Sequence, residues 1–97
     1  MLVALERFDL RIPGCGSLKE KRHVVKALTA GIRSKFNVSV AEVDHHDLWQ
    51  RTTLAVSAVA PEAFHARKVL HEVERFIERY PAVDTIETEL TLHYPDD

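Results

Sequence analysis

The chain has 97 residues, which gives room for a single domain, expected to span residues 1–97. A hydrophobic fraction of 45% with 29% charged residues excludes a disordered chain, and no apolar run reaches the roughly 18–20 residues that a membrane span needs. One cysteine excludes an internal disulfide and a net charge of −2 excludes a uniformly basic nucleic-acid binder, so we expect a cytoplasmic protein held together by its core.

Residues 2–12 alternate apolar and polar side chains, which predicts a strand with one buried face. Glu6 falls on the apolar side of this alternation. It requires a strand end, a bulge or a partner, and the pattern does not choose among them. Ser17 and Glu20 then form a capping box, which opens a helix that runs from residue 18 to about residue 35.

Two further strands are predicted over residues 38–44 and 49–60, and the short connection between them indicates a hairpin. A second helix opens at Pro61 and ends before Pro81, and residues 85–94 alternate again as a last strand. Two helices with one apolar stripe each can cover only one face of a four-stranded sheet. The order βαββαβ therefore predicts an α+β, ferredoxin-like sandwich with an antiparallel sheet in the order 4-1-3-2 and one open face.

Charge is distributed unevenly along the chain. Residues 17–36 hold six Lys and Arg and one Glu, whereas residues 81–97 hold five acidic residues and no Lys or Arg. A basic helix can follow a phosphate backbone, although a solvated basic face is the alternative. The predicted strands lack the aromatic pair on which RNA-recognition motifs stack bases, so binding would be electrostatic and shape-led. The candidate nucleic-acid contacts are Arg11, Lys19, Lys21, Arg22, Lys26 and Arg33.

Residues 13–17 join a strand to a helix N-terminus, a position that favours anions. Acylphosphatases share the element order and hold phosphate in this connection, so a phosphate-binding enzyme is one alternative function and a small-ligand regulatory domain is another. A turn and a capped helix explain the same residues. Cys15 has no base assigned to it, and the consecutive residues 44–47 cannot all converge on one ion. We expect no catalytic residue, no metal and no cofactor.

Two sets of residues are candidates for protein contacts. Trp49, the sole tryptophan, lies with Arg51 at the predicted hairpin, where it either anchors a partner or covers the edge of the core. Val3, Leu5 and Val59 fall on the open face, where pairing of the first and third strands brings them together. A contiguous apolar group on an open face predicts a two-fold homodimer.

Two stretches, Leu10–Arg22 (LRIPGCGSLKEKR) and Phe36–Arg51 (FNVSVAEVDHHDLWQR), resemble the YlxP-like family of small bacterial proteins, a domain of unknown function. The resemblance covers nearly the whole chain and implies a ferredoxin-like fold in a cytoplasmic protein, often encoded among genes for translation and ribosome maturation. It implies no reaction and no catalytic residue, and Cys15 departs from the polar or basic residue associated with that position. Together with the basic helix, it predicts a non-enzymatic module that binds structured RNA or a ribosomal particle.

Overall fold

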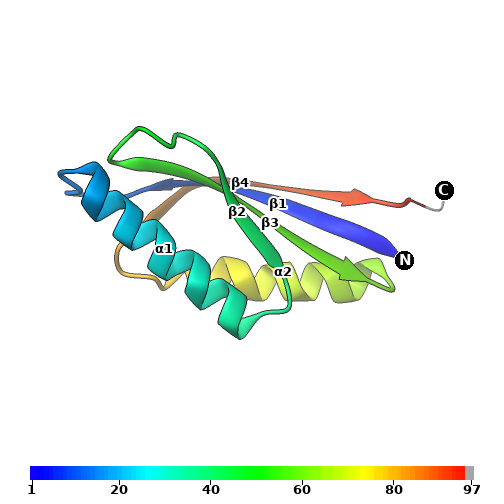
Figure 1. The fold of residues 1–97 in the computed structure, drawn as a ribbon. Coiled ribbons are helices and arrows are strands. Elements are labelled where there is room, and N and C mark those ends of the chain that lie inside the picture. The colour runs from blue at the N-terminus through cyan, green and yellow to red at the C-terminus, as the bar shows by residue number, and fades with distance from the viewer. Residues whose placement is uncertain (96–97) are drawn as a thin grey trace.

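The computed structural model describes residues 1–95, and Asp96 and Asp97 of the acidic C-terminal segment lie outside the described residues. The predicted βαββαβ order is confirmed, and the ends of the elements differ from prediction by no more than two residues. The elements are β1 (Leu2–Arg11), α1 (Leu18–Lys35), β2 (Ser39–Asp44), β3 (Arg51–Ala60), α2 (Ala63–Glu78) and β4 (Asp84–His93) (Figure 1).

The four strands form one antiparallel sheet in the order β2-β3-β1-β4, which is the predicted order 4-1-3-2. β1 and β3 lie in the centre, and β2 and β4 form the edges. Both helices lie on the same side of the sheet, so its other face is open (Figure 1). Within residues 1–95, neither helix has the length and apolar character that crossing a membrane requires.

The core lies between the sheet and the two helices. Burial along β1 alternates as the sequence predicts, because successive side chains of a strand point to opposite faces. The fully buried apolar side chains include Phe8 and Leu10 of β1, Leu28 and Ile32 of α1, Leu54 of β3, and Leu70, Val73 and Ile77 of α2.

Glu6 lies in the middle of β1, opposite Val56 and Leu90, and is 0% exposed. It is therefore neither at a strand end nor at the bulge of the β1–β4 ladder, which falls between Asp9 and Leu10. Burial first, and then the interaction with the neighbouring Glu74 carboxyl of α2, raises the pKa of Glu6 to about 9. The group beside Glu6 is thus a second carboxyl, no hydrogen bond to either Glu6 carboxyl oxygen is formed among the described residues, and Glu6 is protonated at neutral pH.

Candidate nucleic-acid interface

The N-terminus of α1 carries the predicted capping box. The Glu20 amide donates to Oγ of Ser17 at 3.1 Å, and the Gly16 amide donates to the Glu20 carboxylate at 2.9 Å. Cys15 is buried, and its thiol donates to the Ser17 carbonyl at 3.5 Å. Two of the amides that an anion would need are therefore already bonded, which does not favour the phosphate-binding alternative.

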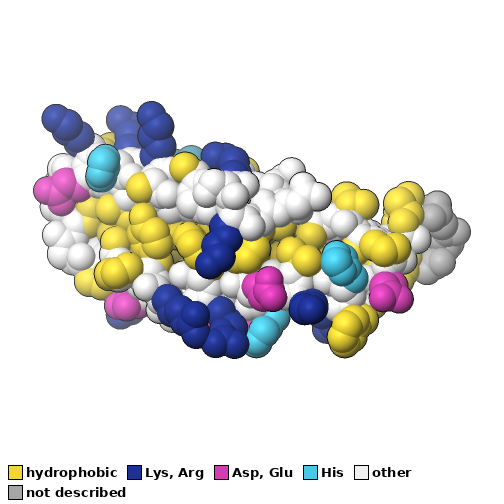
Figure 2. Space-filling model, turned by 90° about the horizontal axis from the view of Figure 1, so that it is seen from below, with side chains coloured by type: hydrophobic (Ala, Val, Ile, Leu, Met, Phe, Trp, Pro, Cys, Tyr) yellow, Lys and Arg dark blue, Asp and Glu magenta, His cyan; other side chains and the backbone are white. Residues whose placement is uncertain are grey.

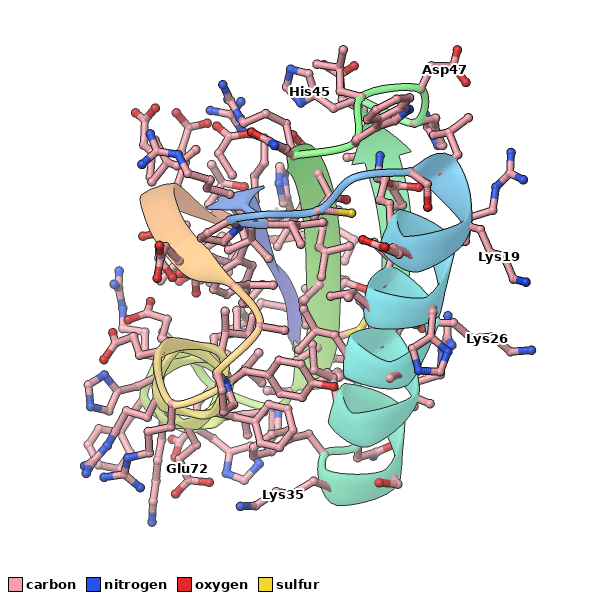
Figure 3. The ribbon with its side chains drawn as sticks, turned by 90° about the vertical axis from the view of Figure 1, so that its left-hand side faces the viewer. Lys19, Lys26, Lys35, His45, Asp47 and Glu72 are labelled. Atoms are coloured by element: carbon pink, nitrogen blue, oxygen red, sulfur yellow. The ribbon has the colours of Figure 1, made fainter. Side chains whose placement is uncertain are left out.

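Four basic residues of α1 lie on one side of the helix. At about 100° per residue, Lys19, Arg22, Lys26 and Arg33 fall within about 60° of one another and span about 21 Å along the axis. All four are exposed, and none forms an ion pair with a carboxylate in residues 1–95. Lys19 and Lys26 project from the side of α1 that faces away from α2 (Figure 3). We call these four residues the outer stripe.

Arg33 differs from the other members of the outer stripe in one contact. Its guanidinium donates to the Val40 carbonyl of β2 at 2.8 Å, so it also ties α1 to this edge strand. Beside the stripe, a cavity of about 450 Å³ lies between α1 and β2. Its lining includes Arg22, Lys26, Thr29 and Glu42.

Lys21 belongs to the core side of α1 and not to the outer stripe. It is 1% exposed, and its ammonium contacts the Glu42 carboxylate at 3.0 Å, the His46 carbonyl at 3.0 Å and the His45 carbonyl. The prediction that Lys21 contacts RNA is corrected, because these three partners already occupy its ammonium. Its helical spacing relative to Leu28 and Ile32 was the sequence signal for this placement.

Arg11 also lies away from the outer stripe. It pairs in register with Arg51, and cross-strand partners share a face, so both arginines lie on the open face of the sheet. Nε of Arg51 is buried and has no hydrogen-bond partner among residues 1–95. Trp49 is 50% exposed and lines a shallow cavity with Leu48 and Arg51 at this end of the molecule. The structure thus divides the predicted contacts between two faces.

Sequence reasoning missed a chain of polar contacts that holds the loop between β2 and β3. The Thr53 hydroxyl donates to the Asp9 carboxylate at 2.6 Å, and it therefore accepts from Nδ1 of His45, which lies 2.9 Å away. His45 has a φ of 61°, and its amide donates to the Asp44 carboxylate at 2.7 Å. Only the strand register, which places Asp9 opposite Thr53, could have shown this link. Within the described part of the chain, no three His, Cys, Asp or Glu residues are grouped so as to hold a metal ion.

The apolar residues predicted for the dimer lie together on the open face. Val3 pairs with Val59, and Leu5 pairs with Ser57 two positions further along the same ladder, on the same face. Val59 is 73% exposed, and Leu5 is exposed to a smaller extent. Charged residues follow along β1, where Arg7 contacts both Asp9 and a glutamate of β4. The open face is therefore apolar at one end and charged at the other.

These features define a small ferredoxin-like sandwich with a basic helical side and an open sheet. The family described as "Protein of unknown function (DUF503)" matches residues 3–90, and the chain belongs to this family. It is 41% identical over 83 residues to the uncharacterized protein YlxP of Bacillus subtilis (strain 168). The aligned region covers 86% of this chain and 90% of that protein. The YlxP-like resemblance is confirmed.

Proposed function

We propose that this protein is a non-enzymatic binding module that contacts structured RNA or a ribosomal particle through the outer stripe. The observation that carries the proposal is the alignment of Lys19, Arg22 and Lys26 on one exposed side of α1 without a carboxylate partner. Cations in such a row bind successive phosphates and release the counterions around them. These side chains can bind phosphates because they form no ion pair within the described chain.

The surroundings of the outer stripe also support an anionic partner. Lys and Arg side chains gather along both margins of the helical side, and carboxylates are few there (Figure 2). The single glutamate in the first turn of α1, Glu20, is bonded to the Gly16 amide. Negative charge is concentrated instead on the edge strand β4, which carries Asp84, Glu87 and Glu89. The protein can thus approach a polyanion with its helices although its net charge is −2.

Filter binding of an RNA hairpin and sedimentation with ribosomal subunits, each at several salt concentrations, test this proposal. Neutralising two residues of the outer stripe, Arg22→Gln with Lys26→Gln, should weaken binding and reduce the slope of log K against log salt by about 1.5. The matched control is Arg67→Gln with Lys68→Gln, which removes the same charge from α2. Binding that is independent of salt, or equal losses in both variants, would contradict the role of the outer stripe.

The same proposal includes a two-fold homodimer through the open sheet face. The apolar end of that face, with Val3, Leu5 and Val59, would meet its symmetry copy, and the charged end would contribute opposite charges from β1 and β4. This arrangement leaves both outer stripes exposed. Sedimentation velocity at tens of micromolar should show a dimer that Val59→Asp converts to a monomer, while Val43→Asp, at an exposed valine of β2, leaves it intact. A wild-type monomer under these conditions rules out the dimer.

A further inference from the structure

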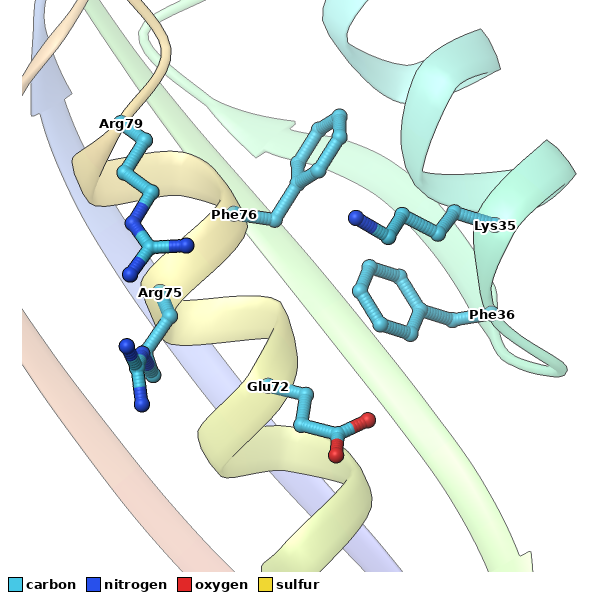
Figure 4. A pocket seen from close by; sticks show the side chains of 6 residues that line it. All are labelled: Lys35, Phe36, Glu72, Arg75, Phe76 and Arg79. Carbon is cyan, nitrogen blue, oxygen red and sulfur yellow. The ribbon is translucent and has the colours of Figure 1, made fainter.

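A second basic site lies where the C-terminal ends of the two helices approach each other. It is a cavity of about 390 Å³ (Figure 4), a volume within the usual range for small-ligand sites. None of its lining residues belongs to the outer stripe. We call it the interhelical cleft. Its lining comprises Lys35 and Phe36 at the end of α1, and Glu72, Arg75, Phe76 and Arg79 at the end of α2.

Two aromatic rings form the apolar part of the interhelical cleft. The Phe36 and Phe76 rings meet edge to face, with centroids 5.9 Å apart and an interplanar angle of 87°. Tyr80 packs against Phe76 with centroids 6.1 Å apart. Phe76 also lies directly against the α1 backbone, since a Cβ atom at Gly31 would come within 3.1 Å of its Cζ. The rings are therefore held in place, yet they are only partly buried.

Three cations line the same cleft, and of these Lys35 contacts the rings. The Lys35 ammonium lies 5.5 Å from the Phe76 centroid and 5.9 Å from the Phe36 centroid, and it points between the two rings (Figure 4). Arg75 and Arg79 lie one turn apart on α2. None of the three cations forms an ion pair with a carboxylate in residues 1–95, although Glu72 lines the same cleft.

Helix C-termini favour cations, which accounts for positive charge at this position. It does not account for a pair of partly exposed aromatic rings among those cations. A planar aromatic group can stack against the rings, and a phosphate attached to it can accept hydrogen bonds from the arginines. A nucleotide contains both groups. The Lys35 ammonium has a flexible stem, so it can move from the rings to the phosphate when a base arrives.

We propose that the interhelical cleft binds one unpaired nucleotide of the RNA, with the base against Phe36 and Phe76 and the phosphate at Arg75, Arg79 and Lys35. This inference rests on the proposed RNA-binding function and adds to it a preference for RNA with an unpaired base beside a helix. The outer stripe would hold the paired region, and the cleft would hold the flanking nucleotide. Stacking against aromatic side chains tolerates all four bases, so no sequence preference is expected.

Two RNA hairpins test the preference, one blunt-ended and one with a short 3′ overhang of adenosines. The wild-type protein should bind the overhang hairpin about tenfold more tightly, which is within the range for one stacked base. Arg75→Gln with Arg79→Gln should abolish that preference and leave binding of the blunt hairpin within about twofold. Arg67→Gln with Lys68→Gln, the matched control on the same helix, should retain it. Equal wild-type affinities for the two hairpins, or a preference that survives in the Arg75 and Arg79 variant, would overturn the proposal.

A titration with AMP and with ribose 5-phosphate separates the interhelical cleft from the outer stripe. AMP should shift the ring proton resonances of Phe36 and Phe76, and ribose 5-phosphate, which lacks the base, should not. Phe76→Leu should reduce the AMP-induced shifts. If that variant does not fold, Arg75→Gln with Arg79→Gln, both at exposed positions, should reduce the shifts instead. If AMP shifts the Phe36 and Phe76 resonances but the Arg22→Gln, Lys26→Gln variant still binds RNA hairpins with wild-type affinity, the cleft is supported and the proposed function is contradicted. Absence of AMP-specific shifts overturns the cleft whatever the stripe does.

Discussion

The regions beneath the two helices each contain a buried ionisable side chain, and they differ in the groups that surround it. Beneath α1, the Lys21 ammonium contacts the Glu42 carboxylate and two loop carbonyls. Beneath α2, Glu6 lies beside a second carboxyl, Glu74, and the Thr88 side chain, and its burial together with Glu74 raises its pKa so that it remains protonated. A buried charge persists only where the fold supplies opposite charge and hydrogen bonds, and otherwise the group is neutralised. The first region thus depends on a specific set of contacts, and the second depends on pH.

The largest effect should come from removing the charge beneath α1. Lys21→Ala leaves the Glu42 carboxylate and the carbonyls of His45 and His46 without their cation, and it should lower the free energy of unfolding by about 3 kcal/mol. Urea denaturation followed by circular dichroism measures this change. Lys26→Ala, on the exposed outer stripe of the same helix, should stay within about 0.5 kcal/mol of wild type. A loss below about 1 kcal/mol for Lys21→Ala would mean that the buried contacts contribute little.

Because of Glu6 beneath α2, the free energy of unfolding should depend on pH. The pKa of Glu6 lies at about 9 in the folded state, above the value of 4.5 for an unperturbed glutamate, so the folded protein retains a proton that the unfolded chain has lost. The associated stability is complete below about pH 4.5 and is lost as the pH rises toward about 9. Glu6→Gln should remove this dependence, which amounts to about 1 kcal/mol per pH unit between pH 6 and 8.

The measurement is the difference in free energy of unfolding between wild type and Glu6→Gln at pH 6, 7 and 8. Glu87→Gln, at an exposed carboxylate of the same sheet, serves as the control and should leave the pH dependence unchanged. The free energy of unfolding of Glu6→Gln, relative to that of wild type, should increase from pH 6 to pH 7 and again from pH 7 to pH 8. Parallel curves for the two proteins would show that Glu6 does not hold its proton in the folded state.

Much of this molecule follows from local sequence signals. Strand alternation, the Ser17–Glu20 capping box and the two amphipathic helices predict the topology, because each of these patterns is determined within about a dozen residues. The outer stripe is likewise visible from helical spacing. Lys21 shows where local reasoning stops: its spacing places it on the core side, but its partner Glu42 belongs to a strand whose register the sequence does not reveal.

The interhelical cleft and the location of Arg11 depend entirely on tertiary structure. Lys35 and Phe36 meet Phe76 across forty residues of chain, and neither helix alone indicates a cleft. Arg11 follows a buried residue of β1 and therefore points to the open face, so a basic residue near α1 in the sequence lies on the opposite side of the sheet. Clusters of like charge in sequence divide among faces once strands and helices are assembled.

The N-termini of the two helices offer a smaller test of the same comparison. α1 begins at Ser17, whose side chain accepts from the Glu20 amide, whereas α2 begins at Glu62, which makes no such bond. Ser17→Ala should therefore cost about 1 kcal/mol, and Glu62→Ser should add about 0.5 kcal/mol, because serine can accept from the amides of the first turn. Thermal and urea denaturation of both variants check the two signs. A destabilised Glu62→Ser protein would show that the Glu62 side chain stabilises α2 in another way.

The smallest change in stability is expected where the two helices touch. Gly31 lies inside α1, where replacement by alanine normally stabilises a helix by about 1 kcal/mol. Here the new Cβ would lie 3.1 Å from Cζ and 3.6 Å from Cε2 of Phe76, so the ring must shift by a few tenths of an ångström and lose part of its packing. The two effects oppose each other, and Gly31→Ala should remain within about 0.5 kcal/mol of wild type.

Ala30→Gly provides the matched control, because Ala30 is an exposed neighbour on the same helix and nothing offsets the loss of helix propensity there. It should cost about 1 kcal/mol in urea denaturation. The displaced ring in Gly31→Ala should also weaken the AMP-induced shifts of Phe36 and Phe76, although overall stability barely changes. If Gly31→Ala instead stabilises the protein by the full 1 kcal/mol and leaves those shifts intact, then Phe76 yields freely, and the close contact between α1 and α2 does not position the rings of the interhelical cleft.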